Sequence, residues 1–117
     1  MSDRVKPHLP DGATMADFQR YVHALEAFHG WLDVDLVHNC FLMGEEMGEL
    51  FKGVRKVQRL FDEPAKADED MPARVANVGE EIIDVLNYLL AIANRLDIDV
   101  EQAFRAKNAA NLERTWD

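Results

Sequence analysis

The chain contains 117 residues, 48% of them hydrophobic, which is enough for one hydrophobic core but not for two. Its formal net charge of −9 disfavours binding to nucleic-acid polymers or to anionic membranes, because both require a basic patch. The longest apolar run, Tyr88–Ala93, is far below the roughly 20 residues that span a bilayer, and residues 1–12 contain no signal-peptide stretch. We therefore expect a soluble, cytoplasmic protein of one domain.

The first part of the chain predicts an arm followed by a helix. Residues 1–12 contain two prolines and a glycine and are expected to form a flexible arm, so that residues 13–117 make up the domain. Thr14 is a suitable N-cap, and apolar residues follow it at helical spacing. We expect this helix to end near Gly30.

A long second helix is expected to begin after Asp33 or Asp35, either of which can act as its N-cap, and to run to about Phe61. It contains Gly44 and Gly48, whose spacing indicates the close approach of a neighbouring helix. One apolar face of this helix is expected to lie in the core. This face consists of Cys40, Met43, Met47, Leu50, Phe51 and Val54.

Two further helices complete the prediction. A polar loop over Asp62–Pro72 precedes a third helix over about Ala73–Leu96. Asp99 is expected to cap a fourth helix, with Gln102 at the capping-box position. No segment shows the alternation of a strand, so we predict an all-α, four-helix-bundle-like domain.

The third helix is apolar around more than half of its circumference, as the positions of Ile82, Leu86 and Leu90 illustrate. A helix that is apolar on most sides needs neighbours on most sides, and one small bundle does not supply them. We therefore predict a homodimer or a dimer of dimers that buries the surplus apolar surface.

Each of the two long helices carries an acidic cluster. These clusters are Glu45-Glu46-x-x-Glu49 and Glu80-Glu81-x-x-Asp84. Residues three or four apart share a helix face, so each cluster directs at least two carboxylates the same way and repels itself. With 22 acidic residues in the chain, one such pattern is expected by chance, and a solvated acidic surface is the alternative. Glu46 and Glu81 border apolar faces, however, which favours a cation site.

Magnesium is the cation that best suits such a site, with manganese as a substitute. Mg²⁺ prefers oxygen ligands and completes its shell with water or with substrate phosphates. Carboxylates together with Mg²⁺ therefore favour a polyphosphate ligand, whose hydrolysis the metal can assist by activating a water. A zinc site is disfavoured because the four histidines and the one cysteine form no cluster of suitable spacing.

A stripe near the C-terminus consists of Lys107, Asn111 and Arg114, which recur at i, i+4 and i+7. Two cations and an amide that point the same way suit a triphosphate, because arginine makes bidentate contacts to phosphate and lysine supplies a point charge. A solvated helix face is the alternative reading of this stripe.

Three stretches of the chain together resemble the MazG-like branch of the all-α NTP pyrophosphatases. They are "GEEMGELFKG" (44–53), "GEEIIDVLNYLLAIANRLDIDVEQAF" (79–104) and "KNAANLERTW" (107–116). The family pattern is EExxE, a spacer, ExxD, and then Lys, Asn and Arg on a later helix, and the likeness covers most of residues 18–116. The resemblance implies Mg²⁺-dependent hydrolysis of a nucleoside triphosphate between the α and β phosphates, typically to remove surplus or damaged nucleotides.

The resemblance also implies roles for individual residues. The implied Mg²⁺ ligands are Glu46, Glu49, Glu81 and Asp84. Glu45 would be an additional catalytic residue, beside Glu46 and Glu49, that positions or activates the attacking water. The implied contacts to phosphate or sugar are Lys107, Asn111 and Arg114. The spacer is somewhat longer than in the family pattern, which bears on the base pocket more than on the metal site.

Two aromatic residues are candidates for contact with the nucleotide base. Tyr88 lies one turn beyond Asp84 and shares its helix face, and Trp31 precedes the second helix. Aromatic residues at such positions also serve core or dimer packing, which is the alternative.

Three other functions fit parts of the sequence. A phosphoribosyl-ATP pyrophosphohydrolase would share the same scaffold and differ in substrate. A di-iron bundle would require two Glu-x-x-His motifs, whereas the chain has one, Glu26 to His29, which Gly30 ends at once. A non-catalytic helical module would bind a basic partner through its acidic face and would not need a metal.

Overall fold

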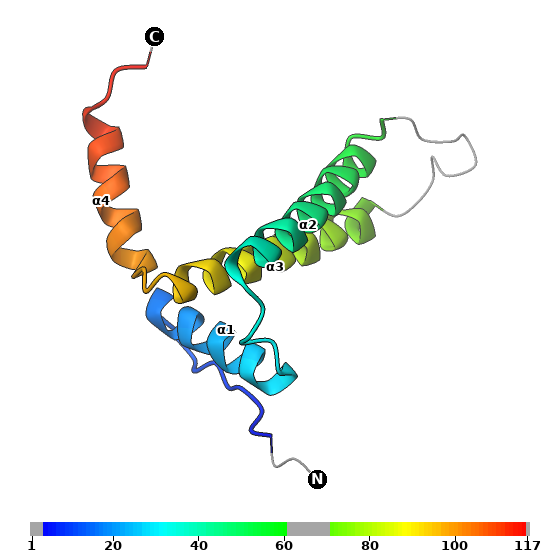
Figure 1. The fold of residues 1–117 in the computed structure, drawn as a ribbon. Coiled ribbons are helices and arrows are strands. Elements are labelled where there is room, and N and C mark those ends of the chain that lie inside the picture. The colour runs from blue at the N-terminus through cyan, green and yellow to red at the C-terminus, as the bar shows by residue number, and fades with distance from the viewer. Residues whose placement is uncertain (1–3, 61–70, 117) are drawn as a thin grey trace. The chain divides into compact units, whose positions relative to one another are not determined.

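The computed structural model describes residues 4–60 and 71–116, and these residues form four α-helices and no β-strand (Figure 1). The helices are α1 (Met15–His29), α2 (Leu36–Val57), α3 (Met71–Arg95) and α4 (Val100–Glu113). The all-α prediction is confirmed for this part of the chain. α2 ends at Val57, four residues before its predicted end near Phe61, and α3 begins at Met71, so that Met71 and Pro72 of the predicted loop are helical. The rest of the loop predicted over Asp62–Pro72 lies outside the described residues.

The chain divides into two compact units. The first unit comprises Met1–Leu36 and Leu90–Asp117, and the second comprises Val37–Leu89. The first unit therefore contains α1, α4 and the last residues of α3, and the second contains most of α2 and α3. Within residues 4–60 and 71–116, no helix is both long enough and apolar enough to cross a membrane.

The two ends of α1 lie where the sequence predicts them. The Thr14 hydroxyl accepts a hydrogen bond from the backbone N–H of Asp17 (3.2 Å), and the Asp17 carboxylate accepts one from the backbone N–H of Thr14 (2.8 Å). This reciprocal pair is a capping box, which satisfies two backbone donors that a helix N-terminus leaves unpaired. Gly30 ends the helix in the left-handed conformation (φ 75°), which glycine adopts without a steric penalty.

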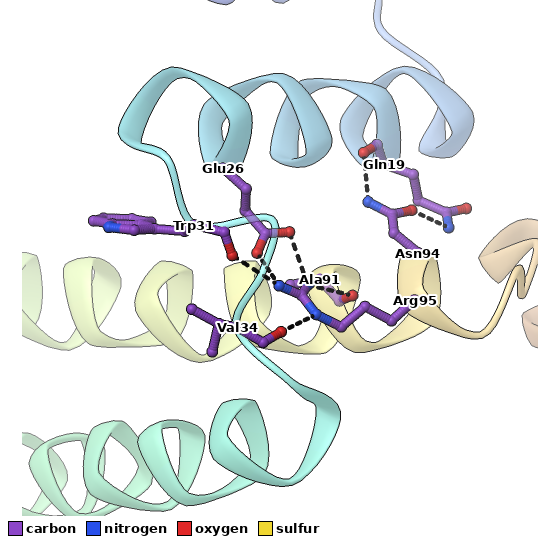
Figure 2. A network of polar contacts seen from close by, with 7 residues as sticks. All are labelled: Gln19, Glu26, Trp31, Val34, Ala91, Asn94 and Arg95. Carbon is purple, nitrogen blue, oxygen red and sulfur yellow. Dashed lines mark hydrogen bonds and ion pairs between the residues drawn. The ribbon is translucent and has the colours of Figure 1, made fainter.

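In the first unit, side-chain amides join α1 to the end of α3, as Figure 2 shows, and a side-chain amide of α1 also reaches the start of α4. The Gln19 side chain donates to the Asn94 side chain (3.1 Å), and the Asn94 side chain donates to the backbone carbonyl of Gln19 (2.9 Å). Gln19 also accepts a hydrogen bond from the backbone N–H of Val100, the first residue of α4. The predicted N-cap of α4 is confirmed, because Asp99 accepts from the backbone N–H of Gln102 (3.1 Å).

A largely buried ion pair in the first unit joins Glu26 of α1 to Arg95 of α3. Two guanidinium nitrogens of Arg95 donate to the two carboxylate oxygens of Glu26, at 2.7 and 3.0 Å (Figure 2). The same guanidinium donates to the backbone carbonyls of Trp31, Val34 and Ala91. It therefore ties the segment between α1 and α2 to the end of α3. Among the residues that the structure describes, the buried apolar ones are few: Val22, Leu90, Ala91 and Ala93.

In the second unit, α2 and α3 lie side by side and run antiparallel (Figure 1). The Arg74 guanidinium on α3 donates to the backbone carbonyl of Lys56 near the end of α2. Gly53 is buried against α3, where a Cβ atom would lie 3.2 Å from the Asn77 amide nitrogen and 3.3 Å from a methyl group of Val78. The absence of a side chain at Gly53 thus allows the two helices to approach closely.

Two predictions for the second helix are wrong. Beyond the adjacent residues and the nearby backbone of α2 itself, no atom of the described residues lies within 4 Å of a Cβ placed on Gly44 or on Gly48, so the close approach is made at Gly53 instead. Of the face expected in the core, Cys40, Met47, Phe51 and Val54 are exposed, and Met43 and Leu50 are half-buried. Both errors have one cause: α2 is apolar on two faces, and only one of them contacts α3. Hydrophobic spacing alone does not say which face that is.

Candidate metal centre

Three carboxylates from the two antiparallel helices converge in the second unit. One oxygen each of Glu46 on α2 and of Glu81 and Asp84 on α3 lie within 4.8 Å of one another. Glu81 and Asp84 are three residues apart and therefore share one face of α3. Glu46 comes from the neighbouring helix, α2. Because α2 and α3 run antiparallel, position 46 of α2 lies beside positions 81–84 of α3.

This convergence is electrostatically unfavourable without a cation. Burial raises the pKa of Glu46, and the charges of Asp84, Glu81, Glu49 and Glu45 raise it further. Burial likewise raises the pKa of Glu81, followed by the charges of Asp84, Glu49 and Glu80. Both shifts mean that the ionised form of the carboxylate is disfavoured, which is the situation that a bound divalent cation reverses.

A buried carboxylate oxygen of Glu81 has no hydrogen-bond partner among the described residues. A buried acceptor without a partner costs free energy, because the group has lost its water and gained nothing in exchange. A hard cation with oxygen ligands would satisfy this atom, and the donor set of three carboxylates suits Mg²⁺ or Mn²⁺. The residues present therefore fit the metal that the sequence pattern predicts.

The two remaining acidic candidates on α2 lie beside the trio. Glu49 is exposed and is not one of the three converging residues, but its charge acts on both Glu46 and Glu81. Glu45 is also exposed and acts on Glu46. Three of the four predicted ligands are thus brought together, and the fourth lies close enough to raise the pKa of two of them.

The C-terminal stripe lies on α4 and its end, in the first unit. Lys107 and Arg114 are exposed, and the Arg114 guanidinium lies 3.9 Å from the centre of the Trp116 ring. The Asn111 amide donates to Asn108 (3.3 Å), while its carbonyl oxygen is buried and has no hydrogen-bond partner in residues 4–60 and 71–116. The stripe therefore carries two accessible cations and one acceptor that lacks a partner.

The two aromatic candidates have different environments. Trp31 is 51% exposed, and its ring stacks on that of His29 with centroids 4.3 Å apart. Tyr88 is half-buried on α3, one turn after Asp84. Trp31 belongs to the first unit and Tyr88 to the second, so only Tyr88 shares a unit with the acidic trio.

Sequence reasoning missed the partnership of Glu26 with Arg95. Glu26 drew attention only as half of a Glu-x-x-His motif, yet its carboxylate is bound to the Arg95 guanidinium and His29 stacks on Trp31. These contacts disfavour the di-iron alternative, because they occupy both side chains of the motif. One feature of the sequence indicates this ion pair: Glu26 lies on the apolar face of the first helix, where a charged residue needs a partner.

Compared with known proteins, the chain matches no protein-family model and no curated protein sequence. The likeness to the MazG-like pyrophosphatases therefore rests on the motifs of this sequence, and the function follows as a proposal.

Proposed function

We propose that the protein is a Mg²⁺-dependent nucleoside triphosphate pyrophosphohydrolase. It would cleave a ribo- or deoxyribonucleoside triphosphate between the α and β phosphates, and the products would be the monophosphate and pyrophosphate. The observation that carries the proposal is the convergence of Glu46, Glu81 and Asp84, together with a buried carboxylate oxygen of Glu81 that lacks a hydrogen-bond partner among the described residues. The order of the three sequence motifs supports the choice of substrate.

The protein's contribution to the reaction would be mainly electrostatic. Glu46, Glu81 and Asp84 would hold the metal, with Glu49 as a fourth ligand. The bound Mg²⁺ would supply charge neutralisation at the phosphates and a more acidic water. Glu45, exposed beside Glu46, would position that water or accept its proton.

The remaining candidates would bind the nucleotide. The accessible cations Lys107 and Arg114, together with Asn111, would contact the phosphates or the sugar. Tyr88 and Trp31 would contact the base. A role in clearing surplus or damaged nucleotides from the pool follows from this substrate class.

We also propose that the protein works as a homodimer or a dimer of dimers. The large apolar residues Val75, Ile82 and Leu89 on α3 are about half exposed, as expected for a helix that lacks some of its neighbours. Exposure on this scale is unusual for a folded chain on its own and supports burial against a second copy.

A substrate panel tests the proposed chemistry. Standard and modified nucleoside triphosphates, together with phosphoribosyl-ATP, are incubated with Mg²⁺ or Mn²⁺, and pyrophosphate is measured separately from orthophosphate. We expect metal-dependent release of pyrophosphate and monophosphate, and none from the Asp84→Asn variant. Turnover confined to phosphoribosyl-ATP would indicate the related pyrophosphohydrolase. A chain that hydrolyses nothing yet binds a basic peptide without metal would be the interaction module.

A further inference from the structure

The described part of the second unit carries opposite charges at its two ends. Residues 37–49 and 80–89 contain acids but no lysine or arginine, and these acids are Glu45, Glu46, Glu49, Glu80, Glu81 and Asp84. Residues 50–60 and 71–79 contain cations but no acid, and these cations are Lys52, Arg55, Lys56, Arg59 and Arg74. Because α2 and α3 run antiparallel, the acidic segments lie together at one end of the helix pair and the cationic segments at the other (Figure 1).

Lys52 on α2 is an exposed cation that neither of the usual local roles explains. It follows Glu49 by three residues, a spacing at which opposite charges on a helix commonly pair. Yet the Lys52 side chain forms no ion pair and no hydrogen bond with the described residues. The charge of Glu49 instead raises the pKa of Glu46 and of Glu81, which indicates that its carboxylate lies on the side of the acidic trio. Lys52 also lies before the last turn of α2, where a cation would stabilise the helix dipole.

Asn77 on α3 offers a neutral donor at the same level of the helix pair. It precedes Glu81 by four residues and Asp84 by seven, so the three side chains share one face of α3. The Asn77 amide nitrogen lies 3.2 Å from the position that a Cβ on Gly53 would take, and it is therefore beside α2, next to Lys52 in the sequence of that helix. The Asn77 side chain is exposed and makes no hydrogen bond with the described residues.

The acidic trio and the two donors beyond it bind opposite kinds of group. Carboxylates bind a hard cation, whereas an ammonium group and an amide N–H bind the oxygens of an anion. The helix rise places Lys52 about 9 Å along α2 from Glu46, and Asn77 about 6 Å along α3 from Glu81. A ligand that engages both ends must therefore chelate a metal ion and extend beyond it as an anion. A chain of two or three phosphates meets both requirements, whereas a single phosphate or a carboxylate meets only the first.

We propose that Lys52 and Asn77 form a phosphate-binding subsite beside the metal centre, and that this subsite holds the phosphates of a metal-chelated polyphosphate beyond the one at the metal. Both residues belong to the same unit as the acidic trio, so the second unit carries its own contacts to the phosphate chain. The inference rests on the proposed metal centre and deepens the proposed function, because it names two residues that distinguish a triphosphate from a monophosphate. Lys56, half-buried one turn after Lys52, would meet the end of the longest chain.

The test is the affinity of the full chain for inorganic phosphates of increasing length, measured by isothermal titration calorimetry at saturating Mg²⁺. We expect the affinity of the wild type to rise from orthophosphate to pyrophosphate to tripolyphosphate. Lys52→Met should raise the dissociation constant for tripolyphosphate about tenfold or more and change that for orthophosphate by less than about twofold. Lys52→Arg should keep most of the affinity, because it keeps the charge. Arg105→Met, which removes one charge from the exposed surface of α4, is the matched control and should bind as the wild type does.

Substitutions of Asn77 separate a contact to phosphate from a structural role. Asn77→Ala should raise the dissociation constant for tripolyphosphate roughly two- to tenfold and leave the affinity for Mg²⁺ alone unchanged. Asn77→Asp replaces a donor by a further carboxylate on the face of Glu81 and Asp84. It should therefore bind Mg²⁺ alone more tightly and tripolyphosphate more weakly. A structural role of Asn77 would lower both affinities together and would count against the proposal.

The outcomes distinguish this inference from the proposed function. Tripolyphosphate affinity that stays within about twofold of the wild-type value in both Lys52→Met and Asn77→Ala would overturn the inference, even for a chain that hydrolyses nucleotides. The same holds for a wild type that binds tripolyphosphate no more tightly than orthophosphate. A chain that hydrolyses no nucleotide, yet binds tripolyphosphate with Mg²⁺ through Lys52 and Asn77, would support the subsite and refute the proposed reaction.

Discussion

The Arg95 guanidinium binds the Glu26 carboxylate through two hydrogen bonds, and it also holds three backbone carbonyls from the segment before α2 and from α3 itself. Both side chains are largely buried, with exposed fractions of 15% for Arg95 and 9% for Glu26. An ion pair of this kind matters most when one partner is removed, because the other is then left buried and charged.

Arg95→Met should therefore be among the most destabilising single substitutions in the chain. We expect the free energy of unfolding to fall by about 3 to 5 kcal/mol, measured by urea denaturation. Arg95→Lys should recover only part of it, because an ammonium group cannot reproduce the bidentate contact. The double variant Glu26→Leu/Arg95→Met should be less destabilised than the sum of the single changes. Strict additivity would show that the two residues are not energetically coupled.

The capping box of α1 makes stability depend on pH. The hydrogen bond from the Thr14 backbone N–H, followed by those from the side chains of Arg20 and Thr14, lowers the pKa of Asp17. Because the folded pKa lies below the unfolded one, the contribution is fully present above about pH 4 and is lost as the pH falls through the folded value. Asp17→Asn should flatten this part of the profile of thermal unfolding temperature against pH. A profile identical to that of the wild type would contradict the assignment.

Removal of one carboxylate from the acidic trio should have opposite effects with and without metal. Without metal, Glu81→Gln should raise the thermal unfolding temperature, because it removes a charge from a site that disfavours charge. With saturating Mg²⁺, the stabilisation that the wild type gains should be lost. Glu113→Gln, which removes one acidic charge at the exposed end of α4, would be a control for net charge alone. Equal Mg²⁺ stabilisation of the wild type and of Glu81→Gln would place the metal elsewhere.

Loss of a metal ligand should also abolish turnover without unfolding the chain. We expect Asp84→Asn or Glu49→Gln to lower kcat on the order of 100-fold or more, with helical circular dichroism unchanged. If a substitution acts by weakening the affinity for Mg²⁺, a higher Mg²⁺ concentration should recover part of the activity. Normal turnover of both variants at saturating Mg²⁺ would show that the site is misplaced.

The C-terminal stripe can be tested against a neighbour on the same helix. Lys107→Met and Arg114→Met should each raise KM and lower kcat, because charge develops on the departing pyrophosphate. A lost charge-assisted contact of about 1.5 to 3 kcal/mol corresponds to roughly a 10- to 150-fold fall in kcat/KM. Arg105→Met is the matched control, since Arg105 pairs with Glu101 on the exposed surface of α4. If kcat/KM of Lys107→Met and of Arg114→Met stays within about twofold of the wild-type value, the stripe is a solvated helix face that does not contact the substrate.

Local features of the fold could be predicted from the sequence because they depend on residues close together in the chain. The capping residues Thr14 and Asp99 and the terminating Gly30 act within one helical turn. The pairing of Glu81 with Asp84 likewise follows from a spacing of three residues. The convergence of Glu46 with this pair was a hypothesis about two helices, and the structure brings the three together.

The features that could not be predicted depend on contacts between distant segments. Gly53 rather than Gly44 or Gly48 contacts α3, and Arg95 reaches across 69 positions to Glu26. Neither contact can be predicted from a local sequence pattern, because each depends on the register of one helix against another. The exposure of Cys40 has the same origin, because a helix that is apolar on two faces does not reveal which face its own chain will cover.

Because Gly53 has no side chain, it sets how closely α2 and α3 approach each other. It lies two turns from Glu46 on the same face of α2, and the nearest atoms of α3 leave little room for even one methyl group. A Gly53→Ala change would act as a wedge that pushes α3 away from α2, and the gap between their carboxylates would widen with it. If the acidic trio binds a cation as proposed, the affinity would thus be adjustable at a position that carries no charge and touches no ligand.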